Sequence, residues 1–304
     1  MNSEALEKIA NAVLYEGYML YPYRASAVKN RQRFNFGVLY PREYCDLQAG
    51  SDRWEMQTEC LVTGSAAALL EVKVRFLQMI ARQEEFQARQ EFLEGVERTV
   101  STNAAGLRAL EMQPLRQRFH FDDVEGELEL RAKRIDDGCF RITLVVRNLI
   151  CLPNPAEVSR EEVLRHSPVS VHSILHTSGG KFISSIDPPE RYKGAISECC
   201  NLGGWPVLAG EEGQLDTVLS APIILYDYPQ IAPESPGDLF DGTEIDEILA
   251  LRILTMTDTE KQEVRNGDDR TRRILERTEM LPREHFQKLH GALRGLRANP
   301  EESR

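Results

Sequence analysis

The stretch that decides the fold reads ELELRAKRIDDGCFRITLVVR, from residue 127 to residue 147. Apolar side chains occupy every second position in two runs, and this period is typical of a β-strand with one buried face. Between the runs lies Asp137-Gly138, a dipeptide that favours the positive φ angles of a tight hairpin turn. The sequence therefore predicts an antiparallel hairpin over 127–148. Its second strand is expected to place four side chains in the core: Phe140, Ile142, Leu144 and Val146.

Outward from this hairpin, the same alternation or a β-branched and apolar composition predicts more strands. They are expected over residues 34–40, 53–62, 70–76 and 218–226, the first of them stopped by Pro41. Apolar residues at helical spacing predict an N-terminal helix over 4–15 and a second helix over 83–100. Several antiparallel strands with one polar face indicate a sandwich or a curled sheet.

The pattern changes near residue 230. The prolines Pro229, Pro233 and Pro236 restrict the loop there, and beyond it apolar residues recur at helical spacing among many charges. We therefore predict an α+β protein with two parts. Residues 1–230 are expected to form an antiparallel β-rich body with an N-terminal helix. Residues 231–304 are expected to form a Pro-rich loop followed by a mainly helical C-terminal region.

Composition disfavours several classes of partner. The 304 residues include 37 Lys and Arg against 48 Asp and Glu, a formal net charge of -11, and an acidic chain repels nucleic-acid phosphates. No apolar run approaches the roughly 18 residues that a membrane helix needs. The N-terminus lacks the basic and apolar parts of a signal peptide. We expect a cytoplasmic protein that binds neither nucleic acid nor membrane.

Two histidines and two cysteines are the candidate metal ligands. In a helix, His172 and His176 would share a face and could bind a metal with Cys199 or Cys200. Their β-branched flanks favour a strand, in which a spacing of four places the histidines about 13 Å apart. The six cysteines form no CxxC pair. The sequence therefore predicts ordinary, partly buried histidines, no tightly bound zinc and no cofactor.

The two adjacent thiols allow a catalytic alternative. Cys199 and Cys200 precede Gly203-Gly204, and the backbone N–H groups of such a turn can approach a substrate beside a thiol nucleophile. No histidine and acid accompany them at the spacing of a known cysteine-nucleophile family. A buried thiol pair at the end of a strand is the favoured interpretation.

A basic and aromatic stretch stands out in this acidic chain. Residues 18–41 carry four spaced cations, and no acid lies between residues 16 and 43. The cations could bind an acidic protein partner together with the prolines of the loop, or they could pair with the chain's own acids. The predicted partner-binding residues are Arg24, Lys29, Arg31, Arg33, Pro229, Pro233 and Pro236.

Two stretches, LYPYRASAVKNRQRFNFG over 20–37 and APIILYDYPQIAPESPGDLFDGTEIDEIL over 221–249, resemble an uncharacterised bacterial family. Genes of that family lie near high-affinity, actinobacterial-type nickel–iron hydrogenases, and the resemblance extends along most of the chain. It implies a cytoplasmic factor for hydrogenase assembly, maturation or action. The chain lacks the paired CxxC motifs that hold nickel and iron in hydrogenase large subunits. The resemblance therefore does not imply a catalytic subunit.

The predicted function is a non-catalytic accessory or scaffold protein that binds a protein partner, either a hydrogenase subunit or a maturation factor. Two alternatives stay open. One is a metal- or thiol-dependent enzyme that uses His172, His176, Cys199 or Cys200, and bound metal would favour it. The other is a structural subunit of a larger complex, which obligate co-purification at a fixed ratio would favour.

Overall fold

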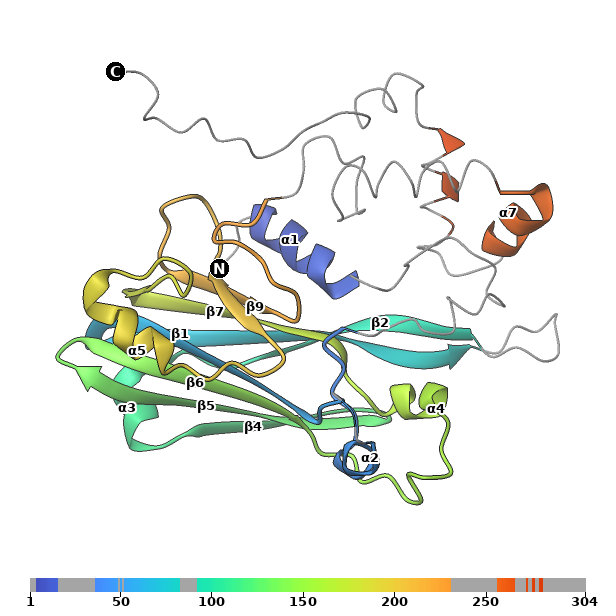
Figure 1. Ribbon diagram of the computed structural model, residues 1–304, viewed down its shortest axis with the longest axis horizontal. Helices are drawn as coiled ribbons and strands as arrows, with labels where there is room; N and C mark the ends of the chain where they lie inside the picture. The colour runs from blue at the N-terminus through green and yellow to red at the C-terminus, as the bar shows by residue number, and fades with distance from the viewer. Residues whose placement is uncertain are drawn as a thin grey trace. The chain divides into compact units, whose positions relative to one another are not determined.

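Strands dominate the part of the chain that this computed structural model describes (Figure 1). The described residues are 4–15, 36–48, 50, 52–82, 92–230, 256–265, 272, 275–276 and 279–280. The chain divides into two compact units, one of Met1–Tyr18 and Phe34–Gln230 and the other of Met19–Arg33 and Ile231–Arg304. In the second unit, helix α7 spans Asp258–Arg265. The predicted domain division and helical C-terminal region stay predictions, because most of that region lies outside the described residues.

The first unit contains one antiparallel sheet of nine strands, ordered β4-β5-β6-β1-β7-β9-β8, with β2 and β3 also paired to β1. The antiparallel β-rich body is therefore confirmed. The strands are β1 Glu55–Arg82, β2 Phe92–Ser101, β3 Ala105–Gly106, β4 Leu115–Phe121, β5 Val124–Asp136, β6 Cys139–Asn148, β7 Val169–Phe182, β8 Trp205–Leu208 and β9 Thr217–Ala221. The helices of this unit are α1 Glu4–Tyr15, α2 Arg42–Leu47, α3 Leu107–Met112, α4 Arg160–Arg165, the 3-10 turn η2 Glu190–Tyr192 and α5 Lys193–Ser197.

The predicted hairpin is confirmed as β5 and β6. The two strands pair antiparallel, and Gly138 in the turn has a φ of +95°. The four apolar side chains expected in the core are all buried. Because Asp-Gly tolerates the positive φ of the turn and the alternation fixes the register, local sequence is sufficient to specify this element.

The longest strand, β1, folds back on itself. Its first part pairs with β6, starting at Glu55, and its second part pairs with β7 on one side and with β2 on the other. A straight strand would carry Phe76 about 70 Å beyond Glu55. The rings of Phe76 and Phe119 nevertheless lie 5.5 Å apart, although Phe119 in β4 lies at the Glu55 end of the sheet. β1 therefore reverses direction, and Figure 1 shows its two parts running opposite ways.

Glycines permit this reversal. A Cβ on Gly64 would lie 3.0 Å from the carbonyl oxygen of Gly179 and 3.0 Å from Cα of Gly180. A Cβ on Gly180 would lie 2.7 Å from Oγ1 of Thr177. The register of β1 against β7 shifts between Gly64 and Leu69. The two strands thus bend together through a corner where their backbones approach closely.

The bend divides the sheet into two layers that enclose the core. We define the β4 layer as β4, β5, β6 and residues 55–63 of β1, and the β8 layer as residues 69–82 of β1 with β2, β7, β9 and β8. Apolar side chains of both layers belong to one buried cluster, and α3 adds Leu107 and Leu110 to it. Burial of these side chains between the layers is the main stabilising contribution to the fold.

Helix α1 covers the outer face of the β8 layer, where it contacts β7 and β1, and Figure 1 shows it next to β7. Arg75 of β1 is buried beneath it and donates a hydrogen bond to Oδ1 of Asn11 at 2.6 Å. Arg75 also pairs with Glu7 at 3.4 Å. Oγ of Ser170 in β7 donates to the carbonyl of Val13 at 2.8 Å. The predicted N-terminal helix over 4–15 is confirmed, and these polar contacts fix its position on the sheet.

Several local predictions need correction. Residues 92–100 are strand β2 and not helix, because pairing with β1 overrides a spacing that only roughly fits a helix; residues 83–91 lie outside the described residues. The strands expected over 53–62 and 70–76 are parts of one strand, β1. Residues 36–40 form only a single bridge, from Leu39 to Arg53, and Pro41 precedes helix α2. Residues 34 and 35 lie outside the described residues.

Candidate functional site

Most of the predicted partner-binding residues lie outside the described residues: Arg24, Lys29, Arg31, Arg33, Pro233 and Pro236. Pro229 is described and is partly buried at the end of the first unit. The chain directly before Pro229 offers the candidate site within the body. We call residues 222–228 the apolar segment.

The apolar segment exposes two large apolar side chains. Ile224 is 79% exposed and Tyr226 is 84% exposed. The sequence was expected to continue a strand through residue 226, but β9 ends at Ala221. Pro222 follows and cannot donate a backbone hydrogen bond, so it ends the ladder and turns the apolar run out of the sheet. Two exposed apolar side chains on one short segment are typical of an interaction surface.

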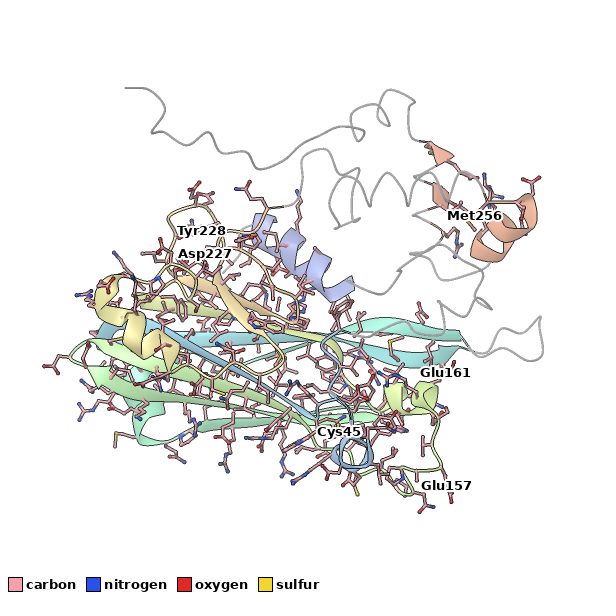
Figure 2. The ribbon with its side chains drawn as sticks, viewed as in Figure 1. Cys45, Glu157, Glu161, Asp227, Tyr228 and Met256 are labelled. Carbon is pink, nitrogen blue, oxygen red and sulfur yellow. The ribbon has the colours of Figure 1, made fainter. Side chains whose placement is uncertain are left out.

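The end of the apolar segment is held firmly against the body. Asp227 accepts hydrogen bonds from the backbone N–H of Leu208 at 2.8 Å and from the hydroxyl of Ser184. The backbone N–H of Tyr228 donates to the carbonyl of Leu208 at 2.7 Å, and its hydroxyl donates to the carbonyl of Gln214 at 2.9 Å. Figure 2 labels Asp227 and Tyr228 where they follow β9. Four hydrogen bonds therefore hold Asp227 and Tyr228, directly after Tyr226, against the body.

These contacts also close the free edge of β8. Ala209 donates its N–H to Thr217 at 3.0 Å, so the neighbouring Leu208 directs its backbone groups away from β9. Those groups bond to Asp227 and Tyr228. Pro206 has the same orientation as Leu208 and carries no N–H to leave unpaired. The edge of β8 is thus blocked against pairing with another strand.

The histidines lie on strand β7, as the β-branched flanks predicted. His172 is fully buried, and its Nδ1 lies 3.0 Å from the carbonyl oxygen of Ser170. Burial is the main reason that the pKa of His172 falls to about 4, and the positive charge of Arg75 acts in the same direction. His176 is partly buried, and its Nδ1 lies 3.1 Å from Oγ1 of Thr217. The structure therefore does not bring the two histidines together on a common ligand.

The thiols belong to a different part of the body. Cys199 packs against the buried cluster of Leu61, Cys139, Ile183 and Tyr192, and its Sγ lies 3.5 Å from the carbonyl oxygen of Ala195. Burial raises the pKa of the Cys199 thiol, although Arg141 acts in the opposite direction. Cys200 is exposed. A thiol that stays protonated is a poor nucleophile, so this geometry does not activate Cys199.

A buried glutamate, which the sequence did not single out, holds the loop of these thiols. Glu59 of β1 accepts hydrogen bonds from the N–H of Cys200 and from Oγ1 of Thr143, each at 2.8 Å. Its own N–H donates to Oδ1 of Asn201 at 2.8 Å. The alternating pattern over 53–62 does not distinguish Glu59 from the other polar residues there. Its hydrogen-bond donor, the N–H of Cys200, is 141 residues away in sequence. The arrangement fixes residues 200–202 to β1, and we assign it a structural role.

Metal and membrane sites can be assessed for the described ranges only. Among those residues, no three of His, Cys, Asp and Glu lie close enough together to hold a metal ion. Within the same ranges, no helix has the length and apolar character needed to cross a membrane. No protein-family model matches the chain, and no curated protein matches it.

Proposed function

We propose that the protein is a non-catalytic accessory protein that binds a protein partner through the apolar segment. The exposure of Ile224 and Tyr226 beside a hydrogen-bonded anchor is the observation that carries this proposal. The first candidate partner is a hydrogenase subunit or maturation factor, and that choice depends on the family resemblance alone.

A fixed apolar pair is suited to binding for two physical reasons. Tyrosine and isoleucine contribute large contact areas, and a few such residues dominate the affinity of many interfaces. Because Asp227 and Tyr228 already hold the backbone, little conformational entropy is lost when a partner docks. Truncating both side chains is therefore expected to cost about 2 kcal/mol or more of binding free energy.

The proposal includes the basic stretch as a second contributor. Arg24, Lys29, Arg31 and Arg33, with Pro229, Pro233 and Pro236, would attract an acidic region of the partner and mainly raise the association rate. Replacing Arg31 and Arg33 with alanine should then weaken capture and leave the melting temperature nearly unchanged. A fall of many degrees would instead mean that these arginines stabilise the fold.

The main experiment compares variants in affinity capture from cells that express the hydrogenase subunits and maturation factors. Ile224→Ser/Tyr226→Ser should reduce the amount of partner captured more than tenfold, as a loss above about 1.4 kcal/mol requires. Met112→Ser is the matched control, because Met112 on α3 is 79% exposed and lies outside the apolar segment. Equal capture by the double variant and the parent would refute the proposal. Co-purification at a fixed ratio that no wash removes would favour a structural subunit.

A further inference from the structure

The edge strand β4 is strongly basic. Between Leu115 and Phe121 it carries Arg116, Arg118 and His120 and no acid. The side chains of Arg116 and Arg118 are 64% and 72% exposed. In the described part of the chain, β4 pairs with β5 alone. One side of this strand is therefore an edge of the sheet.

The backbone of β4 presents hydrogen-bonding groups at this edge. The N–H of Leu149 donates to the carbonyl of Glu125 at 2.9 Å, so Glu125 directs its backbone groups toward β6. His120 is directly opposite Glu125 and accordingly directs its own groups away from β5. Arg118 and Arg116 follow at spacings of two and have the same orientation. Three residues thus offer N–H and C=O groups to an incoming strand.

Charges alternate in sign across the outer face of the β4 layer. Arg118, Glu127, Arg147 and Glu55 occupy directly opposite positions on β4, β5, β6 and β1. Successive N···O distances along this row are 3.8, 3.6 and 3.1 Å. In the next row, Arg116 pairs with Glu129 at 3.1 Å. At the edge of the sheet, the first row ends with the exposed Arg118 and the second with the exposed Arg116.

We propose that β4 binds an extended acidic peptide segment of a partner by strand addition, with two carboxylates at a spacing of two opposite Arg116 and Arg118. Backbone hydrogen bonds would supply affinity, and the next position in each charge row favours an acid. We expect no third carboxylate of the peptide opposite His120, because Asp122 and Asp123 in the adjoining turn would repel it.

Two other occupants fit the edge less well. Antiparallel pairing with β4 of a second copy would place arginines against a strand that carries cations and no acids, and like charges across strands are destabilising. A nucleic-acid strand would meet two cations on a chain with a net charge of -11, and it could not use the backbone ladder. An acidic peptide uses both the charges and the hydrogen-bonding groups.

The test measures fluorescence anisotropy of labelled synthetic peptides with the full-length protein at low salt. The probe is Ser-Thr-Glu-Val-Glu-Thr-Ser, and its counterpart has glutamine in place of both glutamates. The glutamate peptide should bind at least tenfold more tightly. N-methylation of the two glutamate amides should abolish binding, because these amides face β4. N-methylation of the valine amide should not, because it faces away.

Charge reversal gives the matched control. Arg116→Glu/Arg118→Glu should reverse the preference, so that a lysine version of the peptide binds more tightly than the glutamate version. Arg131→Glu/Lys133→Glu makes the same change in net charge at exposed positions on β5 and should leave the preference intact. Circular dichroism and the melting temperature verify that both variants fold.

Three outcomes with the peptides would overturn the proposal. They are equal binding of the glutamate and glutamine peptides, an equal change of preference in both double variants, and retention of binding after N-methylation of the glutamate amides. Tighter binding of a short oligothymidine that depends on Arg116 and Arg118 would also overturn it, because the edge would then be a phosphate-binding surface.

Discussion

The strands that end the sheet, β4 in one layer and β8 in the other, differ in how their outward backbone groups are satisfied. At β8, Pro206 removes a donor and the apolar segment bonds to both backbone groups of Leu208. At β4, the backbone groups of three residues face outward, and Arg116 and Arg118 are exposed. The outer faces differ in the same way, because α1 covers the β8 layer and alternating charges cover the β4 layer.

The difference shows two ways to prevent uncontrolled pairing of a sheet edge. Covering an edge closes it to every strand, whereas placing cations on it closes it only to strands that lack complementary acids. A covered edge adds hydrogen bonds to the fold, and a cationic edge adds little stability but retains selectivity. The stability of the β8 layer should therefore depend on its cover, and that of the β4 layer on its packing underneath.

The largest expected effect tests the packing beneath β4. A Cβ on Gly126 would lie 2.2 Å from Cζ of Phe119 and 2.7 Å from the carbonyl oxygen of Arg147. Gly126→Val should displace the Phe119 ring from the core and lower the free energy of unfolding by about 3–5 kcal/mol in urea denaturation. Gly106→Val is the control, because no atom of the described residues lies within 4 Å of a Cβ there. Equal losses in the two variants would mean that Phe119 packing is not responsible.

The next effect concerns acid and the β8 layer. The pKa of His172 is about 4 in the folded protein and 6.5 in the unfolded chain, because burial disfavours the charged ring. The unfolded chain therefore takes up a proton as the pH falls through 6.5, and the folded protein does so only near pH 4. This contribution to stability is complete above pH 6.5 and is lost between pH 6.5 and 4. It amounts to about 2 kcal/mol between pH 7 and pH 5.

Urea denaturation at a series of pH values measures this effect. His172→Gln should remove the corresponding part of the pH dependence, whatever its effect on stability at pH 7. Among the described residues, the buried Nε2 of His172 has no hydrogen-bond partner, so no acceptor there would stabilise an added proton. An identical pH dependence in the variant and the parent would contradict this assignment.

The smallest effect tests the cover of β8. Asp227→Ala removes the acceptor for Leu208 and Ser184 and should lower the free energy of unfolding by about 1–1.5 kcal/mol. It should also increase light scattering on incubation at high protein concentration, because part of the β8 edge loses its cover. Glu211→Ala, at an exposed position in the preceding loop, serves as the control. Lower stability without added scattering would mean that the cover does not protect the edge.

Local sequence predicts those elements whose partners are close in the chain. The β5–β6 hairpin and helix α1 follow from periodicity and one turn dipeptide. The reversal of β1 could not be predicted, because Gly64 and Gly180 meet only after segments more than a hundred residues apart have paired. Strand β2 was misassigned although its partner is close in the chain, with Phe92 opposite Arg82, because its apolar spacing roughly fits a helix and only the pairing with β1 decides its conformation.

The candidate site was recognised in part. The prolines predicted a binding loop from residue 229 onward, whereas the described anchor consists of Asp227 and Tyr228 just before it. The apolar run at 223–225 was assigned to a strand, because three consecutive apolar residues do not distinguish a strand from an exposed segment. Pro222 was the available signal that the ladder ends. The basic edge at β4 could not be found from sequence, because only the order of strands shows that β4 is terminal.

The reversal of β1 has a consequence during synthesis on the ribosome. Glu55 of β1 pairs with Arg147 of β6, 92 residues later in the chain. At typical elongation rates, about 5 to 20 s pass between the synthesis of Glu55 and the synthesis of its partner Arg147. For that time residues 55–63 of β1 lack the β6 strand with which they pair, whereas residues 73–82 can already pair with β2. The nascent chain therefore depends on slow, non-local pairing, and we expect it to need chaperones that bind extended apolar segments.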